Sequence, residues 1–128
     1  MMKTFSASCH CQAVKIEFDA TLPLVVDDCN CSICLKTGNL YVILPKSQFR
    51  LLTDEQHLSV YRFNTGVAQH TFCKHCGVKP FYTPRSNPDG ISVNARCIDG
   101  ELPEMNIVPF DGQNWEQHAH TLAHKSKD

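Results

Sequence analysis

Cys29, Cys31 and Cys34 stand within six residues of one another, in the pattern C-x-C-x-x-C. Cysteines so close along the chain rarely reach the separation and dihedral angle that a disulfide requires. Three thiolates can, however, bind one soft cation from three directions. We therefore interpret these residues, which we call the three-cysteine cluster, as ligands of one metal ion.

Four further cysteines form two close pairs, each beside turn residues, with the patterns C-x-C and C-x-x-C. The pairs are Cys9 with Cys11 and Cys73 with Cys76, and together we call them the four-cysteine cluster. Structural zinc sites are closed by four protein ligands, whereas catalytic sites keep one position open. The sequence therefore predicts two Zn2+ ions per chain, a structural ion in the four-cysteine cluster and a catalytic ion in the three-cysteine cluster. The alternative for the first set is four unrelated buried thiols.

The fourth position of the three-cysteine cluster decides its role. Water, a substrate, a histidine or Cys97 could fill it. An open position would lower the pKa of a bound thiol or water and hold it as an anion, so the three cysteines are the candidate catalytic residues. With Cys97 as fourth ligand the cluster would be a second structural site, and without metal it would be a redox-active trio. His70, three residues before Cys73, is a candidate proton shuttle.

Short strands and turns must position these cysteines. Strands are predicted at 3–8, 13–18, 24–26, 40–44, 50–52, 58–64, 91–98 and 105–110, and loops at 19–23 and 84–90. Residues 35–38 predict one helical turn, and Asn114, with Gln117 three residues on, predicts the N-cap of a short C-terminal helix. We expect a mainly β fold in a single zinc-binding domain, residues 1–128.

Length and charge restrict the class of protein. A chain of 128 residues with 42% hydrophobic residues forms one small core, which metal sites can cross-link. The formal net charge of -1, without a block of five like charges, argues against nucleic-acid binding, and bound thiolates would make the charge more negative. No segment has the pattern of a signal peptide or a membrane span, and clustered cysteines favour metal over disulfides. We therefore expect a cytoplasmic protein with reduced thiols and no membrane partner.

The cysteine runs and their flanking residues resemble the family that unites glutathione-dependent formaldehyde-activating enzyme with centromere protein V. The resemblance rests on Cys9-His10-Cys11, on Cys29-Asn30-Cys31-Ser32-Ile33-Cys34 and on Phe72-Cys73-Lys74-His75-Cys76-Gly77. It covers about residues 8–115, and the stretches 69–74 and 81–88 look closer to the centromere protein V branch.

This resemblance implies a β-tent fold of small antiparallel sheets pinned by zinc. It implies a structural zinc in the four-cysteine cluster and a catalytic-type zinc in the three-cysteine cluster. It also implies an activity, the formation of S-(hydroxymethyl)glutathione from glutathione and formaldehyde, in the class of carbon–sulfur lyases. The expected partners are then a small-molecule thiol, glutathione, and an aldehyde. The alternative is a non-catalytic zinc-stabilised protein-interaction module like centromere protein V.

The enzymatic interpretation requires a thiolate and an anchor for the substrate. Zinc in the three-cysteine cluster would hold the sulfur of glutathione as thiolate, which is the form that attacks a carbonyl carbon. Glutathione carries two carboxylates, so we expect a basic anchor. Arg85 and Lys36 are the nearest candidates in sequence, and the planar fork of Arg85 suits a carboxylate. The alternative for both is a solvated surface residue.

Overall fold

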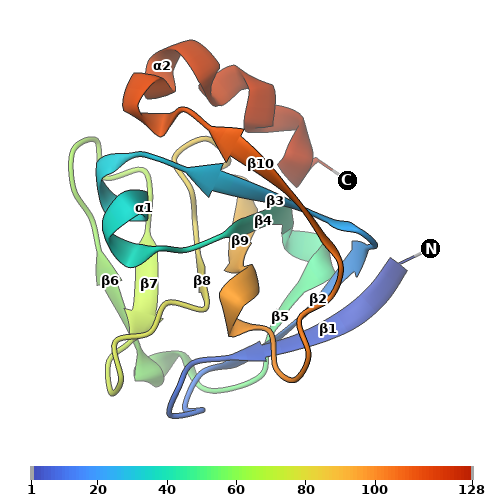
Figure 1. Cartoon of the computed structure of the whole chain (residues 1–128). Coiled ribbons are helices and arrows are strands. Elements are labelled where there is room, and N and C mark those ends of the chain that lie inside the picture. Colours follow the sequence, from blue (N-terminus) through green and yellow to red (C-terminus); the bar gives the residue numbers. More distant parts are fainter. Residues whose placement is uncertain (1, 128) are drawn as a thin grey trace.

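The computed structural model describes residues 2–127, whose strands form three small sheets (Figure 1). The strand orders are β1-β2-β5, β10-β3-β4-β9-β8 and β6-β7. The strands are β1 (Met2–Ser8), β2 (Lys15–Thr21), β3 (Leu24–Cys29), β4 (Tyr41–Pro45), β5 (Phe49–Leu51), β6 (Leu58–Tyr61), β7 (His70–Cys73), β8 (Phe81–Tyr82), β9 (Gly90–Asn94) and β10 (Met105–Phe110). The α-helices are α1 (Ser32–Thr37) and α2 (Trp115–His118), and the 3-10 helices are η1 (Lys46–Gln48), η2 (Glu55–His57), η3 (Ala95–Cys97), η4 (Gly112–Asn114) and η5 (Ala119–Ser126). The predicted mainly β fold of small sheets with a short C-terminal helix is confirmed.

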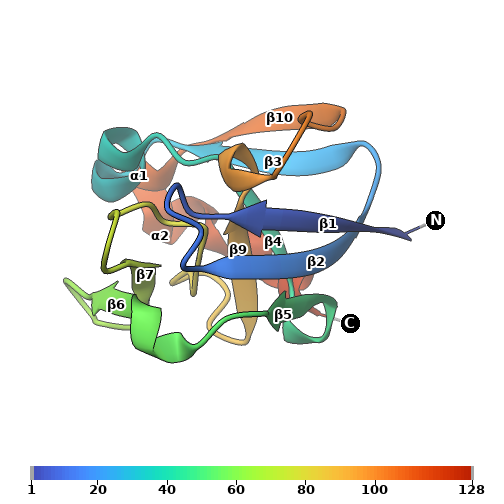
Figure 2. The ribbon, with the colours of Figure 1, turned by 90° about the horizontal axis from the view of Figure 1, so that it is seen from below.

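The first two strands form the predicted antiparallel hairpin, which Figure 2 shows side by side with β5. Alternation along β2 and the residue before it buries Val14, Ile16 and Phe18 completely. The hairpin is longer than predicted, since β2 continues to Thr21 through the loop expected at 19–23. The reason is Asp19, whose carboxylate accepts hydrogen bonds from Thr4 and Arg50 on the neighbouring strands instead of making a turn.

One strand pair departs from the antiparallel arrangement that the resemblance implies. β10 pairs with β3 in parallel, and Phe110 lies opposite Cys29 at the end of the ladder. In Figure 1 both arrows point toward the upper left, where α1 follows β3 and α2 follows β10. Because the carboxyl ends of parallel strands meet at one edge of a sheet, the three-cysteine cluster and the start of the C-terminal segment are neighbours.

The main core fills the space between the three-stranded and the five-stranded sheets. Its largest fully buried apolar side chains are Phe18, Ile16, Leu24, Val14, Val26 and Val93. Two members of the four-cysteine cluster, Cys9 and Cys73, belong to this core and are 2% and 0% exposed. The four-cysteine cluster is therefore part of the packing that holds the domain together.

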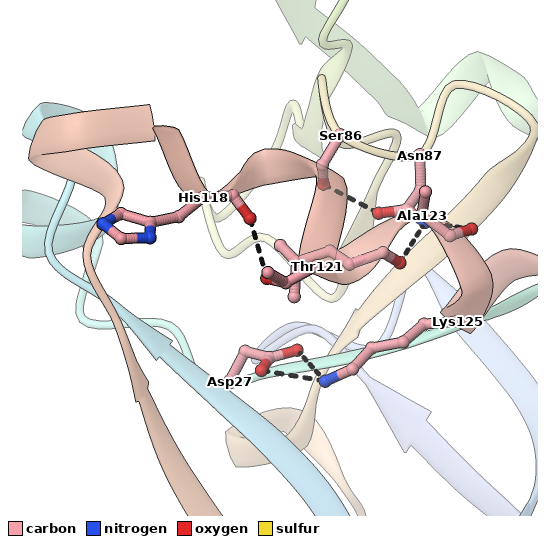
Figure 3. Close-up of polar contacts among 8 residues, drawn as sticks. Asp27, Ser86, Asn87, His118, Thr121, Ala123 and Lys125 are labelled. Atoms are coloured by element: carbon pink, nitrogen blue, oxygen red, sulfur yellow. Dashed lines mark hydrogen bonds and ion pairs between the residues drawn. The ribbon is translucent and has the colours of Figure 1, made fainter. Parts of the chain in front are cut away.

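The C-terminal segment begins differently from the prediction. Asn114 makes no capping hydrogen bond with its side chain; its amide donates to Asp111 instead, and α2 passes after one turn into η5. Several contacts fix the segment to the rest of the domain, among them those with Asp27 and Asn87 (Figure 3). Lys125 Nζ lies 3.0 and 2.9 Å from the carboxylate oxygens of buried Asp27 on β3, and the amide of fully buried Asn87 donates to the Leu122 carbonyl.

The strand expected at 91–98 is shorter than predicted. β9 ends at Asn94, and η3 follows, because the Asn94 side-chain oxygen accepts a hydrogen bond from the Arg96 amide and caps the turn. Cys97 therefore lies on a turn rather than on a strand.

Candidate functional site

The four-cysteine cluster has the geometry of a tetrahedral metal site. Its four sulfur atoms all lie within 4.8 Å of one another. Cys9 Sγ is 3.7 Å from Cys11 Sγ, which is 3.6 Å from Cys73 Sγ. A tetrahedron with zinc–sulfur bonds of about 2.3 Å has edges of about 3.8 Å. The four thiols are thus spaced to hold one metal ion.

Two tight turns bring these sulfurs together from distant parts of the chain. The β1–β2 turn places Gln12 at a positive φ of 68°, and the turn after β7 uses Gly77 at a φ of 77°. Backbone amides point at the sulfurs, since Val14 N donates to Cys9 Sγ and His75 N to Cys73 Sγ. Both turns thereby present hydrogen-bond donors to the cysteine sulfurs.

The two histidines beside this cluster take no part in it. His10 and His75 are exposed, and neither ring nitrogen joins the group of sulfurs. His75 Nε2 lies 3.0 Å from His57 Nδ1 at the surface. Among residues 2–127, the group that could hold a metal ion here therefore consists of the four cysteines, without a histidine.

The three-cysteine cluster lies at the junction of β3 and α1. Cys29 ends β3, and Cys31 caps α1 with its sulfur, which accepts a hydrogen bond from Cys34 N at 3.4 Å. The helix stops at Gly38, whose φ of 68° suits glycine and whose amide donates to the Cys34 carbonyl. The three sulfurs lie within 4.8 Å of one another, and no His, Cys, Asp or Glu elsewhere in residues 2–127 joins them.

The thiols of this cluster cannot all ionise without a cation. Hydrogen bonds from Cys29 and then Cys34 lower the pKa of Cys31, whereas contacts with the other two sulfurs raise the pKa of Cys34. The site thus favours one thiolate and disfavours three. A soft cation relieves this repulsion, so the donor set fits zinc.

Tyr41 on β4 contacts one sulfur of the three-cysteine cluster. Its hydroxyl donates a hydrogen bond to Cys34 Sγ at 3.0 Å, and both residues are buried. Groups that donate to a metal-binding side chain orient it and tune its charge. Sequence analysis did not identify Tyr41.

The backbone at Gly112 lies directly against Cys29 and Cys31 of the three-cysteine cluster. A Cβ at this position would meet Cys29 Sγ and lie 2.8 Å from Cys31 Cβ. The backbone is held there because Gln113 N donates to the Asn30 side chain at 2.9 Å. Only a residue without a side chain fits against the sulfurs at this point.

We expect Gly112→Ala to weaken metal binding at the three-cysteine cluster by at least about ten-fold, because its methyl group displaces the sulfurs. Native mass spectrometry and a competition titration with a zinc indicator measure the loss. Gln113→Ala is the matched control, because it changes the same turn and keeps the amide bonded to Asn30. If Gly112→Ala bound two ions with unchanged affinity, the requirement for glycine at this position would be contradicted.

A cavity of about 390 Å³ opens beside the three-cysteine cluster. This is a common volume for the binding site of a small molecule. The wall contains all three cysteines, polar groups and several aromatic rings: Tyr41, Phe63, His70, Tyr82, Arg85, Ser86, Phe110, Gln113 and Trp115. Segments from four regions of the chain, within 27–43, 63–70, 82–86 and 110–122, therefore surround any molecule that reaches the sulfurs.

Of the two predicted basic anchors, Arg85 lines the cavity and Lys36 does not. Arg85 lies on the wall, with its guanidinium 3.8 Å from the centre of the Trp115 ring and 3.9 Å from the exposed carboxylate of Glu116. Lys36 is exposed on α1 and is not among the lining residues. The contact with Trp115 restrains the guanidinium at the wall, and no hydrogen bond to its side chain is formed within residues 2–127 beyond the 3.9 Å ion pair with Glu116.

Of the two other residues singled out from the sequence, His70 borders the cavity and Cys97 does not. His70 is buried on β7 and borders the cavity. Cys97 lies apart from the three-cysteine cluster, in a second hollow next to Cys9, with its sulfur 3.4 Å from the Asn94 amide. None of the eight cysteines forms a disulfide.

Sequence analysis missed one buried charge, Lys79, whose Nζ lies 2.7 Å from His70 Nδ1. Lys79 stands in the otherwise apolar run Val78-Lys79-Pro80-Phe81-Tyr82, and a charged residue in such a run was the available signal.

The fold and the two thiol clusters define a small mainly β domain that can hold two metal ions, one of them beside a ligand-sized cavity. The sequence profile of the family glutathione-dependent formaldehyde-activating enzyme matches residues 4–117. The chain belongs to this family. The closer resemblance to the centromere protein V branch stays a prediction.

A solved structure is similar to this chain over most of its length. It is the crystal structure of a protein from Rhodobacter sphaeroides, with 30% sequence identity and a TM-score of 0.67. The match covers 79% of this chain and 99% of the other. Within residues 2–127, none of the helices has the length and apolar character needed to cross a membrane.

Proposed function

We propose that this protein is a zinc-dependent carbon–sulfur lyase that forms S-(hydroxymethyl)glutathione from glutathione and formaldehyde. The family supports both substrates. One structural observation carries the proposal: three cysteine sulfurs on a cavity wall, which no fourth metal-binding side chain of residues 2–127 joins. Such a site leaves one position for a substrate group.

The residues that would hold the two ions are the members of the two clusters. In the three-cysteine cluster, zinc would supply a Lewis acid that favours a bound thiol in its deprotonated form. The chain supplies the rest of the site. Tyr41 fixes Cys34, and the Gly112 backbone leaves room for the sulfurs.

The cavity walls orient the two reactants. The rings of Phe63, Tyr82 and Phe110 line the cavity beside the sulfurs and give it an apolar surface. Arg85 on the same wall offers a charged fork for a carboxylate of glutathione. Holding a thiol and an aldehyde in one cavity replaces a bimolecular encounter by a positioned one, which lowers the barrier by several kcal/mol.

Arg85→Ala should raise the KM for glutathione by about 10- to 100-fold with little change in kcat, because a hydrogen bond to a charged group contributes about 1.5–3 kcal/mol. Steady-state kinetics at varied glutathione measure this effect. Lys36→Ala is the control, since its side chain lies outside the cavity and should leave KM unchanged. An equal KM for Arg85→Ala and the wild type would exclude Arg85 as the anchor.

Exchange spectroscopy by NMR tests the activity itself. Labelled formaldehyde and glutathione are mixed with the zinc-loaded protein, and the exchange rate between free and adduct forms is compared with buffer. We expect faster exchange that scales with protein concentration. A rate equal to the buffer rate at saturating protein would reject the enzymatic function and favour the alternative, a non-catalytic interaction module.

A further inference from the structure

Lys79 is a buried ammonium without a carboxylate partner. Its side chain belongs to a residue that is 7% exposed, and no Asp or Glu of residues 2–127 forms an ion pair with it. Its Nζ lies 4.0 Å above the Tyr82 ring and 2.7 Å from His70 Nδ1. Buried lysines are rare unless they are paired, so this arrangement calls for a function.

His70 is held in one orientation by two aromatic rings. Its imidazole stacks on Tyr82, with ring centres 5.1 Å apart and planes inclined by 12°, and on Phe63, at 5.4 Å and 24°. The residue is 5% exposed and borders the cavity that contains the three-cysteine cluster. These contacts restrain the plane of the imidazole, and the Lys79 contact at Nδ1 sets the directions of its two nitrogens.

The contact with Lys79 determines which nitrogen carries the proton. An ammonium group has three donors and no acceptor, so Nδ1 must accept and the proton lies on Nε2. Burial, and secondly the charge of Lys79, lower the pKa of His70 to about 4, so the imidazole is neutral at physiological pH. Burial also lowers the pKa of Lys79 to about 8, opposed by the negative charge of Cys34 and Cys31, so Lys79 is protonated there.

The Nε2–H group has no partner of its own. It makes no hydrogen bond within residues 2–127. It is also not one of the solvent-inaccessible side-chain atoms that lack a hydrogen-bond partner. His70 lies within electrostatic reach of Cys31 and shares the cavity wall with the three cysteines. A fixed donor therefore borders the space where a thiol and an aldehyde would meet.

We propose that His70 is a catalytic residue that donates a hydrogen bond from Nε2–H to the aldehyde oxygen, and that Lys79 is a positioning residue that fixes this tautomer. The inference rests on the proposed function and adds the group that stabilises the reacting oxygen. During addition the sulfur–carbon bond forms and the π bond of the carbonyl breaks, so charge develops on oxygen. The thiol releases its proton to solvent, and the oxygen takes one from solvent, while His70 keeps its own. A preorganised donor aimed at such an oxygen stabilises the transition state more than the substrate.

The tautomer is tested without any substrate, by 15N NMR of the zinc-loaded protein labelled at histidine. His70→Gln identifies the His70 signals by their disappearance. We expect the wild type to show a protonated Nε2 and a bare Nδ1, and Lys79→Met to show a mixture of tautomers. A protonated Nδ1 in the wild type would overturn the proposal, even if Lys79→Met does not fold. An unchanged tautomer in folded Lys79→Met would remove the role of Lys79.

The catalytic role is tested with two substitutions of the histidine. His70→Phe keeps the stacking and removes the donor, and we expect kcat to fall by about 100-fold with both zinc ions retained. His70→Gln restores an N–H near the position of Nε2 and should recover about ten-fold of that loss. If the wild type is active and His70→Phe is equally active, the catalytic role of His70 is overturned, whereas the proposed function is not. An inactive wild type would instead reject the proposed function and leave the tautomer result standing.

Discussion

Cys31→Ser should lose one of two bound metal ions and lower the activity by at least about 100-fold, while the domain stays folded. A serine hydroxyl is not a thiolate, so the three-cysteine cluster keeps only Cys29 and Cys34. The fold survives because Cys31 also caps α1, and serine is a good N-cap that accepts the same hydrogen bond from Cys34 N. Native mass spectrometry gives the metal content, circular dichroism the fold, and the exchange assay the activity.

The matched control is Cys97→Ser. Cys97 lies outside both clusters, so we expect two ions and wild-type activity. If Cys31→Ser kept its activity with one ion bound, the three-cysteine cluster would not be the reaction centre. If it unfolded, the cluster would be structural, as the alternative of a closed second site predicts.

Cys73→Ser should instead destabilise the whole domain, by more than about 4 kcal/mol in the free energy of unfolding. Cys73 is completely buried in the main core, and its sulfur lies 3.6 Å from Cys11 Sγ, which is 62 residues away in sequence. Without the fourth thiolate, an ion no longer joins the β1–β2 turn to the β7 turn. A loss of this size is a large part of the stability of a small domain.

Urea denaturation of zinc-loaded proteins measures this effect from the shift of the midpoint. Cys31→Ser is the control, because it removes a ligand of the other cluster and should move the midpoint far less. Slow withdrawal of metal with a chelator should show the same order, with loss of one ion before unfolding and loss of the second during it. Equal midpoints for Cys73→Ser and the wild type would contradict a structural four-cysteine cluster.

The sequence predicted the sulfur clusters because their information is local. C-x-C and C-x-x-C place two thiols on one side of a turn, and the turns after β1 and β7 have the shape that these spacings predict. The alternating pattern of Val14, Ile16 and Phe18 likewise fixes the buried face of β2. Such features depend on neighbours a few residues apart.

The missed features depend on contacts between distant segments. The parallel pairing of β10 with β3 joins residues about eighty positions apart, and no local pattern distinguishes it from an antiparallel pair. Gly112 follows an aspartate and is typical of an exposed turn, yet it lies against Cys29. Lys79 would be assigned to the surface by its charge alone; its apolar neighbours in sequence hint at burial, and the packing of His70 and Tyr82 around it shows it.

The parallel pairing of β10 and β3 imposes a sequence of assembly on the nascent chain. The four-cysteine set exists once residue 76 has emerged from the ribosome, because it needs the β1–β2 and β7 turns alone. The three-cysteine cluster has its sulfurs by residue 34, but the Gly112 backbone that lies against it and the Lys125–Asp27 contact come from residues translated much later. Since chains emerge from the N-terminus, we expect the four-cysteine cluster to be able to bind an ion earlier in translation than the three-cysteine cluster, whose surroundings include residues 112–125.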